Sequence, residues 1–240
     1  SILGANDRIR LGVIGCGGQG RHDLATFLKH DHSIEVPAIC DVDDAMIAET
    51  QKLLQNAAKP DAAAVKDFRK LLERKDIDVV LVATPDHWHA LQTIHAVQAG
   101  KDVYCEKPLA NSIGEGQAML DWARKTERVV QMGTQWRTSK HHAEAVDYVH
   151  SGKLGKIRLV RCWCALAWFK SVGHVEDSPA PPGVDYDLWL GPAPQQDHHA
   201  NLVHYNWHWF WDFGNGDVGN QGVHQMDIAR WGMNKHDYPV

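Results

Sequence analysis

The sequence has few cysteines, no long apolar run and no excess of basic residues. Its five cysteines are an odd number and form no C-x-x-C pair, which argues against both a disulfide framework and a zinc site. No apolar run reaches the roughly 18 residues that a bilayer-crossing helix needs, so we expect no membrane span. The formal net charge is −5, without a basic stripe, so nucleic acid is a poor candidate partner.

A complete metal-ligand spacing is also lacking, although the chain has 16 histidines. The candidate pairs are His87-x-His89, His141-His142 and His198-His199. Adjacent histidines without a third ligand at a fixed spacing are usually solvated, so we predict no metal site.

The sequence starts at Ser1 without an initiator methionine, and it contains no basic and apolar signal segment. We expect the chain to be incomplete at both ends. The compartment stays open between the cytoplasm and, if an export signal was removed before Ser1, the periplasm.

What the sequence does contain is enough for a large core. It has 240 residues, of which 44% are apolar, a length between one large domain and two small ones. We expect two domains, residues 1–133 and 134–240, with the boundary at Gly133.

A glycine turn between a strand and a helix is the first functional motif. The apolar run 9–14 predicts a strand buried on both faces, and the segment from Gln19 has helical spacing. Gly15, Gly17 and Gly20 fit G-x-G-x-x-G, in which the glycines permit a tight turn, close approach to a pyrophosphate and close helix packing. The turn, with its remaining residues Gly18 and Gln19, is a candidate binding site for a dinucleotide.

A carboxylate follows at the matching distance. A second apolar strand, 34–40, ends in Asp41, twenty-one residues after Gly20, where a carboxylate accepts hydrogen bonds from the adenosine ribose of NAD. It would repel the 2′-phosphate of NADP, and no arginine follows directly, so we expect NAD rather than NADP. The alternative is that Asp41 only caps a loop ahead of Asp43 and Asp44.

The rest of the first domain alternates strands and helices, which predicts a parallel, doubly wound α/β sheet. Ligands of such sheets bind at the carboxyl ends of the strands. Two segments leave those ends, Thr84 to His89 and Glu106-Lys107-Pro108. The expected strands are 78–83, 102–105 and 128–132, and the expected helices are 45–54, 68–72, 90–99 and 112–125.

Taken together, these motifs resemble the Gfo/Idh/MocA oxidoreductases. The glycine turn, Cys40-Asp41, the segment from Ala83 to His89 and Glu106-Lys107-Pro108 occur in the family's order and spacing. The resemblance implies an NAD(P)-dependent enzyme that acts on sugars or cyclitols. It implies a coenzyme site made of Gly15, Gly17, Gly18, Gln19, Gly20, Asp41, Thr84, Pro85, His87, His89, Glu106 and Lys107.

The resemblance also implies a second α/β domain with a large, mostly antiparallel open sheet, of which only the first part is present here. That domain often mediates assembly, so we expect a homo-oligomer, a dimer or tetramer. The sequence predicts a helix over 139–150, a strand over 157–168 and a long loop over 170–200, with a packed turn at 189–192. A dense aromatic stretch, 205–213, is expected to be mostly core.

The catalytic residues come from the same resemblance. The family carries Asp-x-x-x-His on a helix, and here His224 matches the histidine while Asn220 replaces the aspartate. Oxidation of a carbinol needs a base near the hydroxyl and a cation near the developing alkoxide, roles that suit His224 and Lys107. Asparagine can only orient the imidazole, so we expect a weaker proton acceptor unless Asp217 or Asp227 compensates.

Four residues are candidates for the substrate wall, and three functions remain open. The candidates are Arg137, Trp168, Tyr205 and Asp227. The first function is a dehydrogenase or reductase for a sugar, cyclitol or derivative. The second is a glycoside hydrolase or lyase that oxidises its sugar transiently and regenerates NAD. The third is a nucleotide-binding protein without catalytic activity.

Overall fold

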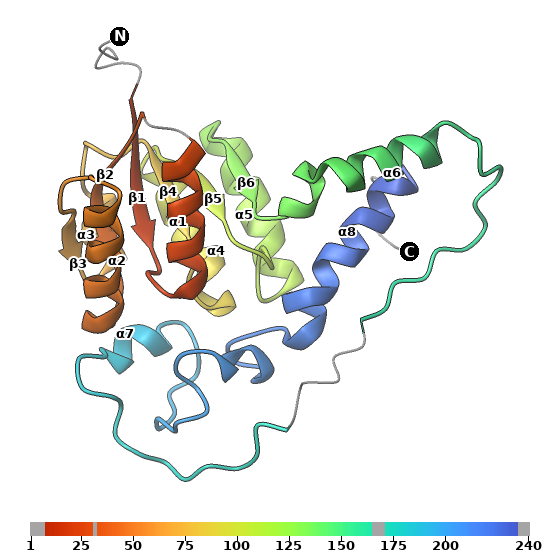
Figure 1. Ribbon diagram of the computed structural model, residues 1–240. Coiled ribbons are helices and arrows are strands. Elements are labelled where there is room, and N and C mark those ends of the chain that lie inside the picture. The colour runs from red at the N-terminus through yellow and green to blue at the C-terminus, as the bar shows by residue number, and fades with distance from the viewer. Residues whose placement is uncertain (1–7, 31–32, 165–170, 235–240) are drawn as a thin grey trace.

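A six-stranded parallel sheet forms the larger part of the molecule (Figure 1). The computed structural model describes residues 8–30, 33–164 and 171–234. The strand order β3-β2-β1-β4-β5-β6 is that of the doubly wound Rossmann fold, which confirms the expected fold class. The strands are β1 (Ile9–Ile14), β2 (Ile34–Cys40), β3 (Ala63–Val65), β4 (Val79–Val82), β5 (Asp102–Cys105) and β6 (Val130–Met132).

Helices cover both faces of the sheet and bury two apolar clusters against it. Leu24 of α1 (Gly18–His30) and Leu54 of α2 (Asp44–Asn56) pack with Val13 on one face. On the other face, Val80 packs with side chains from α3 (Phe68–Leu72), α4 (Asp86–Gln98) and α5 (Ile113–Thr126). None of the helices in the described part of the chain is long and apolar enough to cross a bilayer.

Two local features of the first domain differ from the sequence prediction. Helix α4 begins at Asp86, four residues before the expected start at Ala90, because Pro85 with its φ of −57° already directs the chain into the helix. The segment up to His89 is therefore helical. Strand β3 was not expected, since it is a three-residue edge strand with little apolar surface to signal it.

The C-terminal part contains helices and irregular segments. Helix α6 (Lys140–His150) lies beside α8 (Val223–Gly232) in Figure 1. The expected strand is wrong over residues 157–164, which lie outside the named strands, and Trp163 is 78% exposed. The backbone N–H and C=O groups of a strand need a neighbouring strand as hydrogen-bond partner. The alternation of side chains along one segment does not show whether such a neighbour is present. Residues 165–168 lie outside the described part.

A cover of residues 183–213 packs against the carboxyl ends of the strands (Figure 1). It contains α7 (Tyr186–Leu190) and the short helix η3 (Asn206–Trp209). The Asp185 N–H donates to the Val42 carbonyl at 2.9 Å, and the Asp44 N–H donates to the Gly183 carbonyl at 3.2 Å. Its own small core holds Trp189, Leu190, Leu202, Trp207 and Phe213. Of the expected packed turn at 189–192, Trp189 and Leu190 form the buried end of α7, whereas Gly191 and Pro192 follow it as an exposed turn.

Candidate functional site

The glycine turn has the geometry that its motif predicts. Gly15 has a φ of +93°, and a Cβ there would lie 2.5 Å from the Ala83 carbonyl oxygen. A Cβ on Gly20 would overlap the Gly15 carbonyl oxygen, so helix α1 lies close to the turn. By contrast, a Cβ on Gly17 or Gly18 would meet no heavy atom of the described residues within 4 Å. The backbone at these two positions is therefore accessible to a phosphate at the start of a helix.

Asp41 is held at the end of β2 by two backbone donors. Its Oδ2 accepts from the Cys16 N–H at 2.6 Å and its Oδ1 accepts from the Asp43 N–H at 2.9 Å. Burial raises the pKa of the Asp41 carboxyl, and these two hydrogen bonds oppose that effect. Each oxygen keeps a lone pair for a ribose hydroxyl.

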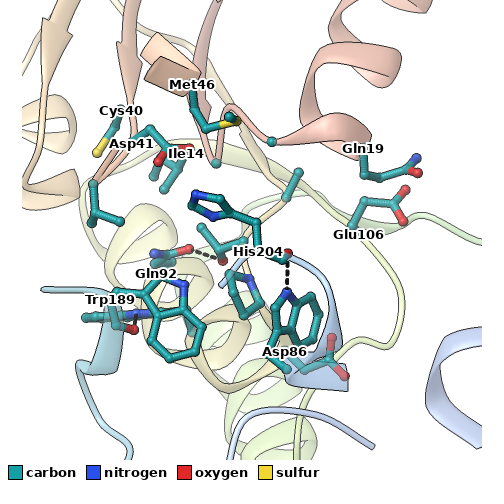
Figure 2. A pocket seen from close by; sticks show the side chains of 18 of the residues that line it. Ile14, Gln19, Cys40, Asp41, Met46, Asp86, Gln92, Glu106, Trp189 and His204 are labelled. Carbon is teal, nitrogen blue, oxygen red and sulfur yellow. Dashed lines mark hydrogen bonds between the residues drawn. The ribbon is translucent and has the colours of Figure 1, made fainter. Parts of the chain in front are cut away.

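A cavity of about 380 Å³ opens at these groups, at the point between β1 and β4 where the strand order reverses (Figure 2). Ligands of open α/β sheets bind at this position. The predicted coenzyme residues that line it are Gly15, Gly17, Gly18, Gln19, Asp41, Thr84, Pro85, Glu106 and Lys107. The C-terminal part contributes Trp189, His204, Tyr205, Trp207, His208 and Asn220 to the same lining.

His204 was not anticipated from the sequence. It follows no recognisable motif, yet Figure 2 shows its ring facing the Asp41 side of the cavity. Its Nε2 lies 2.7 Å from Asp43 Oδ2, while Asp43 Oδ1 accepts from the Ala45 N–H and caps helix α2. The Trp207 indole donates to the His204 carbonyl at 3.0 Å. A contact to the cap of α2 therefore fixes a residue of the cover beside the ribose position.

The structure places His87 and His89 outside the cavity lining. His87 Nε2 lies 3.0 Å from the Trp189 carbonyl, and the ring packs against Phe213. His89 Nδ1 lies 2.7 Å from the Pro108 carbonyl. Burial lowers the pKa of both imidazoles, that of His87 to about 4. Both rings connect α4 to neighbouring segments, and the described residues include no group of three or more His, Cys, Asp or Glu that could hold a metal.

Lys107 is joined to Asn220. Its Nζ donates to the Asn220 side-chain oxygen at 2.8 Å and to the Asn220 carbonyl at 3.0 Å. Asn220 lies in a π-helical turn, η4 (Val218–Gly222), that precedes α8. Such turns often occur at functional sites. The amide oxygen that was expected to orient His224 therefore accepts from the lysine.

His224 is buried on α8 and stacks on Trp136 of the short helix η2 (Gln135–Thr138). Burial lowers the pKa of its imidazole, the Lys107 charge lowers it further, and Asp227 opposes both. His224 lies outside the cavity lining, on the helix that directly follows the η4 turn with Asn220.

Three carboxyl groups near Lys107 have raised pKa values. Burial raises the pKa of Asp86 to about 7, and burial together with the nearby Asp23 raises that of Glu106 to about 7. Burial also raises the pKa of Asp23 to about 6. Groups with shifted pKa values that line a cavity are typical of functional sites, and sequence reasoning missed Asp86 because nothing local predicts its burial.

The candidate substrate residues are not all brought together. Arg137 and Asp227 form a bidentate ion pair, with both N to O distances 2.7 Å. Neither lines the cavity, whereas Tyr205 does and is 54% exposed. Trp168 lies outside the described residues.

An accessible glycine backbone at a helix start, a carboxylate at the ribose position and a cavity at the strand-order reversal define a dinucleotide-binding Rossmann protein. The residues present fit NAD. The chain belongs to the Gfo/Idh/MocA oxidoreductase family: residues 9–134 match its NAD-binding Rossmann fold and residues 149–240 match its C-terminal alpha/beta domain.

Individual relatives support the same assignment. A glycosyl hydrolase family 109 protein of Shewanella sp. (strain ANA-3) is 32% identical over 62% of this chain and 33% of its own length. The chain spans about a third of the length of the curated relatives it matches. The structure of an oxidoreductase domain protein from Kribbella flavida is 25% identical, with a TM-score of 0.69 over 95% of this chain and 54% of that one. The 3-ketoreductase KijD10 from Actinomadura kijaniata, solved with NADP, is 26% identical, with a TM-score of 0.54 over 63% and 46%.

Proposed function

We propose that this protein transfers a hydride between NAD and a carbinol or ketone carbon of a sugar, cyclitol or derivative. The observation that carries the proposal is the position of Lys107. Its side chain lines the coenzyme cavity and is hydrogen-bonded to Asn220, at the start of the segment that carries His224. A cation of the cavity lining is thus bonded to the segment that carries a candidate base.

In the oxidation direction, each residue has a defined task. His224 takes the proton of the reacting hydroxyl; its lowered pKa keeps the imidazole neutral and able to accept near pH 7. Lys107 Nζ stabilises the negative charge that develops on the alkoxide oxygen. Bound NAD supplies the hydride acceptor. Burial of His224 and the cover over the strand ends limit the access of water.

The carboxylate at the ribose end favours NAD over NADP. Asp41 lines the cavity there and would face a 2′-phosphate, while Asp43 lies outside the lining and engages the nearby His204. We also propose that the two domains divide at Gly133. We further propose a homo-oligomeric assembly, which light scattering of the full-length protein would test.

A second function is favoured by one observation, the similarity to the glycosyl hydrolase family 109 protein. In this alternative, His224 and Lys107 support a transient oxidation of a glycoside. Elimination then removes the aglycone, water adds across the resulting double bond, and the hydride returns to the ketone carbon. The products would be free sugar and aglycone, without net NADH.

The deciding experiment follows NADH absorbance and product mass with the full-length protein, NAD and a panel of sugars, cyclitols and glycosides. NADH together with a keto product supports the dehydrogenase, and glycoside cleavage without net NADH supports the hydrolase. Lys107→Met should lower kcat about 100-fold or more while NAD still binds. Lys125→Met is the matched control, because Lys125 lies over the Trp122 ring and does not line the cavity. Equal activity of both variants would contradict the role of Lys107.

A further inference from the structure

We propose that Trp136 is a positioning residue for His224: its indole face orients the imidazole and stabilises the imidazolium formed when His224 takes a proton. The inference rests on the proposed role of His224 as the base. The Asn220 oxygens accept from Lys107 and so do not orient the His224 imidazole. In this proposal, the ring stack with Trp136 orients it instead.

The stack itself is well formed. The ring centroids of Trp136 and His224 lie 5.0 Å apart with an angle of 18° between the planes. The indole also stacks on His142, with the ring centroids 5.0 Å apart and an angle of 11° between the planes. The Nδ1 of His224 is buried and has no hydrogen-bond partner among the described residues. Contact with the indole face therefore restricts the rotation of the imidazole at this buried position.

An ion pair holds the indole in register with α8. Arg137, the next residue in η2, binds Asp227 with two hydrogen bonds, and Asp227 lies one turn beyond His224 on the same helix. The Arg137 guanidinium also lies over the Trp231 ring, 5.4 Å from its centroid. Two contacts made by Arg137 thus attach η2 to α8 next to the stack. The bidentate pair explains what Arg137 and Asp227 do away from the cavity.

The charges around the imidazole leave a role for the indole. Lys107 lowers the pKa of His224 and Asp227 raises it. His142 stacks on the same indole, and Arg137 forms an ion pair with Asp227. The face of an aromatic ring attracts a cation, most strongly for indole. Trp136 therefore favours the protonated state of His224 without a hydrogen bond to it.

The test compares Trp136→Leu, Trp136→Phe and a control, Trp211→Leu, whose side chain is 90% exposed. Leucine keeps an apolar wall but removes the ring. We expect Trp136→Leu to lower kcat about tenfold, with the KM for substrate within twofold of wild type. The acidic limb of the kcat/KM profile should move to lower pH. Trp136→Phe should recover most of the wild-type kcat and most of the wild-type pH profile. The control should match wild type in both quantities.

A second readout separates this proposal from the proposed function. An NMR titration of the His224 ring protons, without substrate, should show an upfield ring-current shift and a higher pKa in wild type than in Trp136→Leu. Equal pKa values, or kcat and profile unchanged in Trp136→Leu, would overturn the positioning role. If the His224 pKa is higher in wild type than in Trp136→Leu but the wild-type protein transfers no hydride, only the proposed function is contradicted.

Discussion

At the scale of single residues, this site departs from expectation in the partner of Asn220. The amide was expected to serve His224, but it accepts from Lys107. The lysine is therefore oriented by a neutral acceptor, and its charge adds to burial in lowering the pKa of the His224 imidazole, while Asp227 opposes both. The base and the cation act on each other directly.

Restoring a carboxylate at position 220 would change that balance. In Asn220→Asp, an ion pair with Lys107 would screen the ammonium charge, and the added negative charge would favour the imidazolium. We expect the pKa of His224 to rise and the acidic limb of the kcat/KM profile to move up by about one pH unit. A profile identical to wild type would show that position 220 does not influence the base.

Asp41 is the residue on which coenzyme choice depends. Asp41→Asn keeps the shape but replaces one acceptor oxygen with a donor and removes the charge. We expect the Kd for NAD to rise about tenfold or more, as for the loss of a hydrogen bond to a charged group, while NADP loses less. Titration calorimetry measures both. Asp44→Asn, which affects an exposed ion pair with Lys66, is the control, and similar losses for the two variants would contradict this role.

At the scale of the element, the turn between β1 and α1 uses its glycines for two physical reasons. Gly15 and Gly20 are required by the protein's own backbone, since a Cβ at either position meets a carbonyl oxygen. Gly17 has room for a Cβ in this structure, so its requirement comes from the ligand that would approach it. Substitution of Gly15 or Gly20 should therefore lower the stability of the protein, whereas substitution of Gly17 should weaken coenzyme binding.

Alanine substitutions test that separation. Gly20→Ala should lower the free energy of unfolding by about 1 to 3 kcal/mol, because α1 must move away from the turn. Gly17→Ala should unfold at the same denaturant midpoint as wild type but bind NAD at least about tenfold more weakly. Urea unfolding and calorimetry measure the two effects, and comparable stability losses in both variants would contradict the assignment.

At the scale of the whole molecule, the two parts of the chain share one cavity. Asp41 and Lys107 follow strands β2 and β5 of the sheet, whereas Trp189 and His204 belong to the cover. The His204 contact to Asp43 joins residues 161 positions apart. A dinucleotide in this cavity would contact both parts and so stabilise the molecule as a unit.

Coenzyme binding should therefore raise the melting temperature. At an NAD concentration about 100 times its Kd, linkage predicts about 2.7 kcal/mol of added stability, or about 5 to 10 °C for a chain of this size. Differential scanning calorimetry should show one transition that shifts, with a smaller shift for an equal concentration of NADP. An unchanged midpoint with NAD would contradict binding to the native state, and an equal shift with NADP would contradict the coenzyme preference.

The sequence by itself determined the doubly wound sheet, the glycine turn and the place of Asp41, because these follow from local apolar runs and fixed short spacings. It did not predict β3 and it wrongly predicted a strand over 157–164, since pairing depends on a neighbour rather than on the segment.

Only the tertiary structure decided which side chains meet across the chain. The contacts of His204 with Asp43, of Lys107 with Asn220 and of Trp136 with His224 join residues far apart in sequence. The burial that shifts the pKa values of Asp86 and Glu106 arises in the same way, from segments folded over them. Local spacing does not predict such contacts, because they form only when the cover packs against the strand ends and α8 packs against η2.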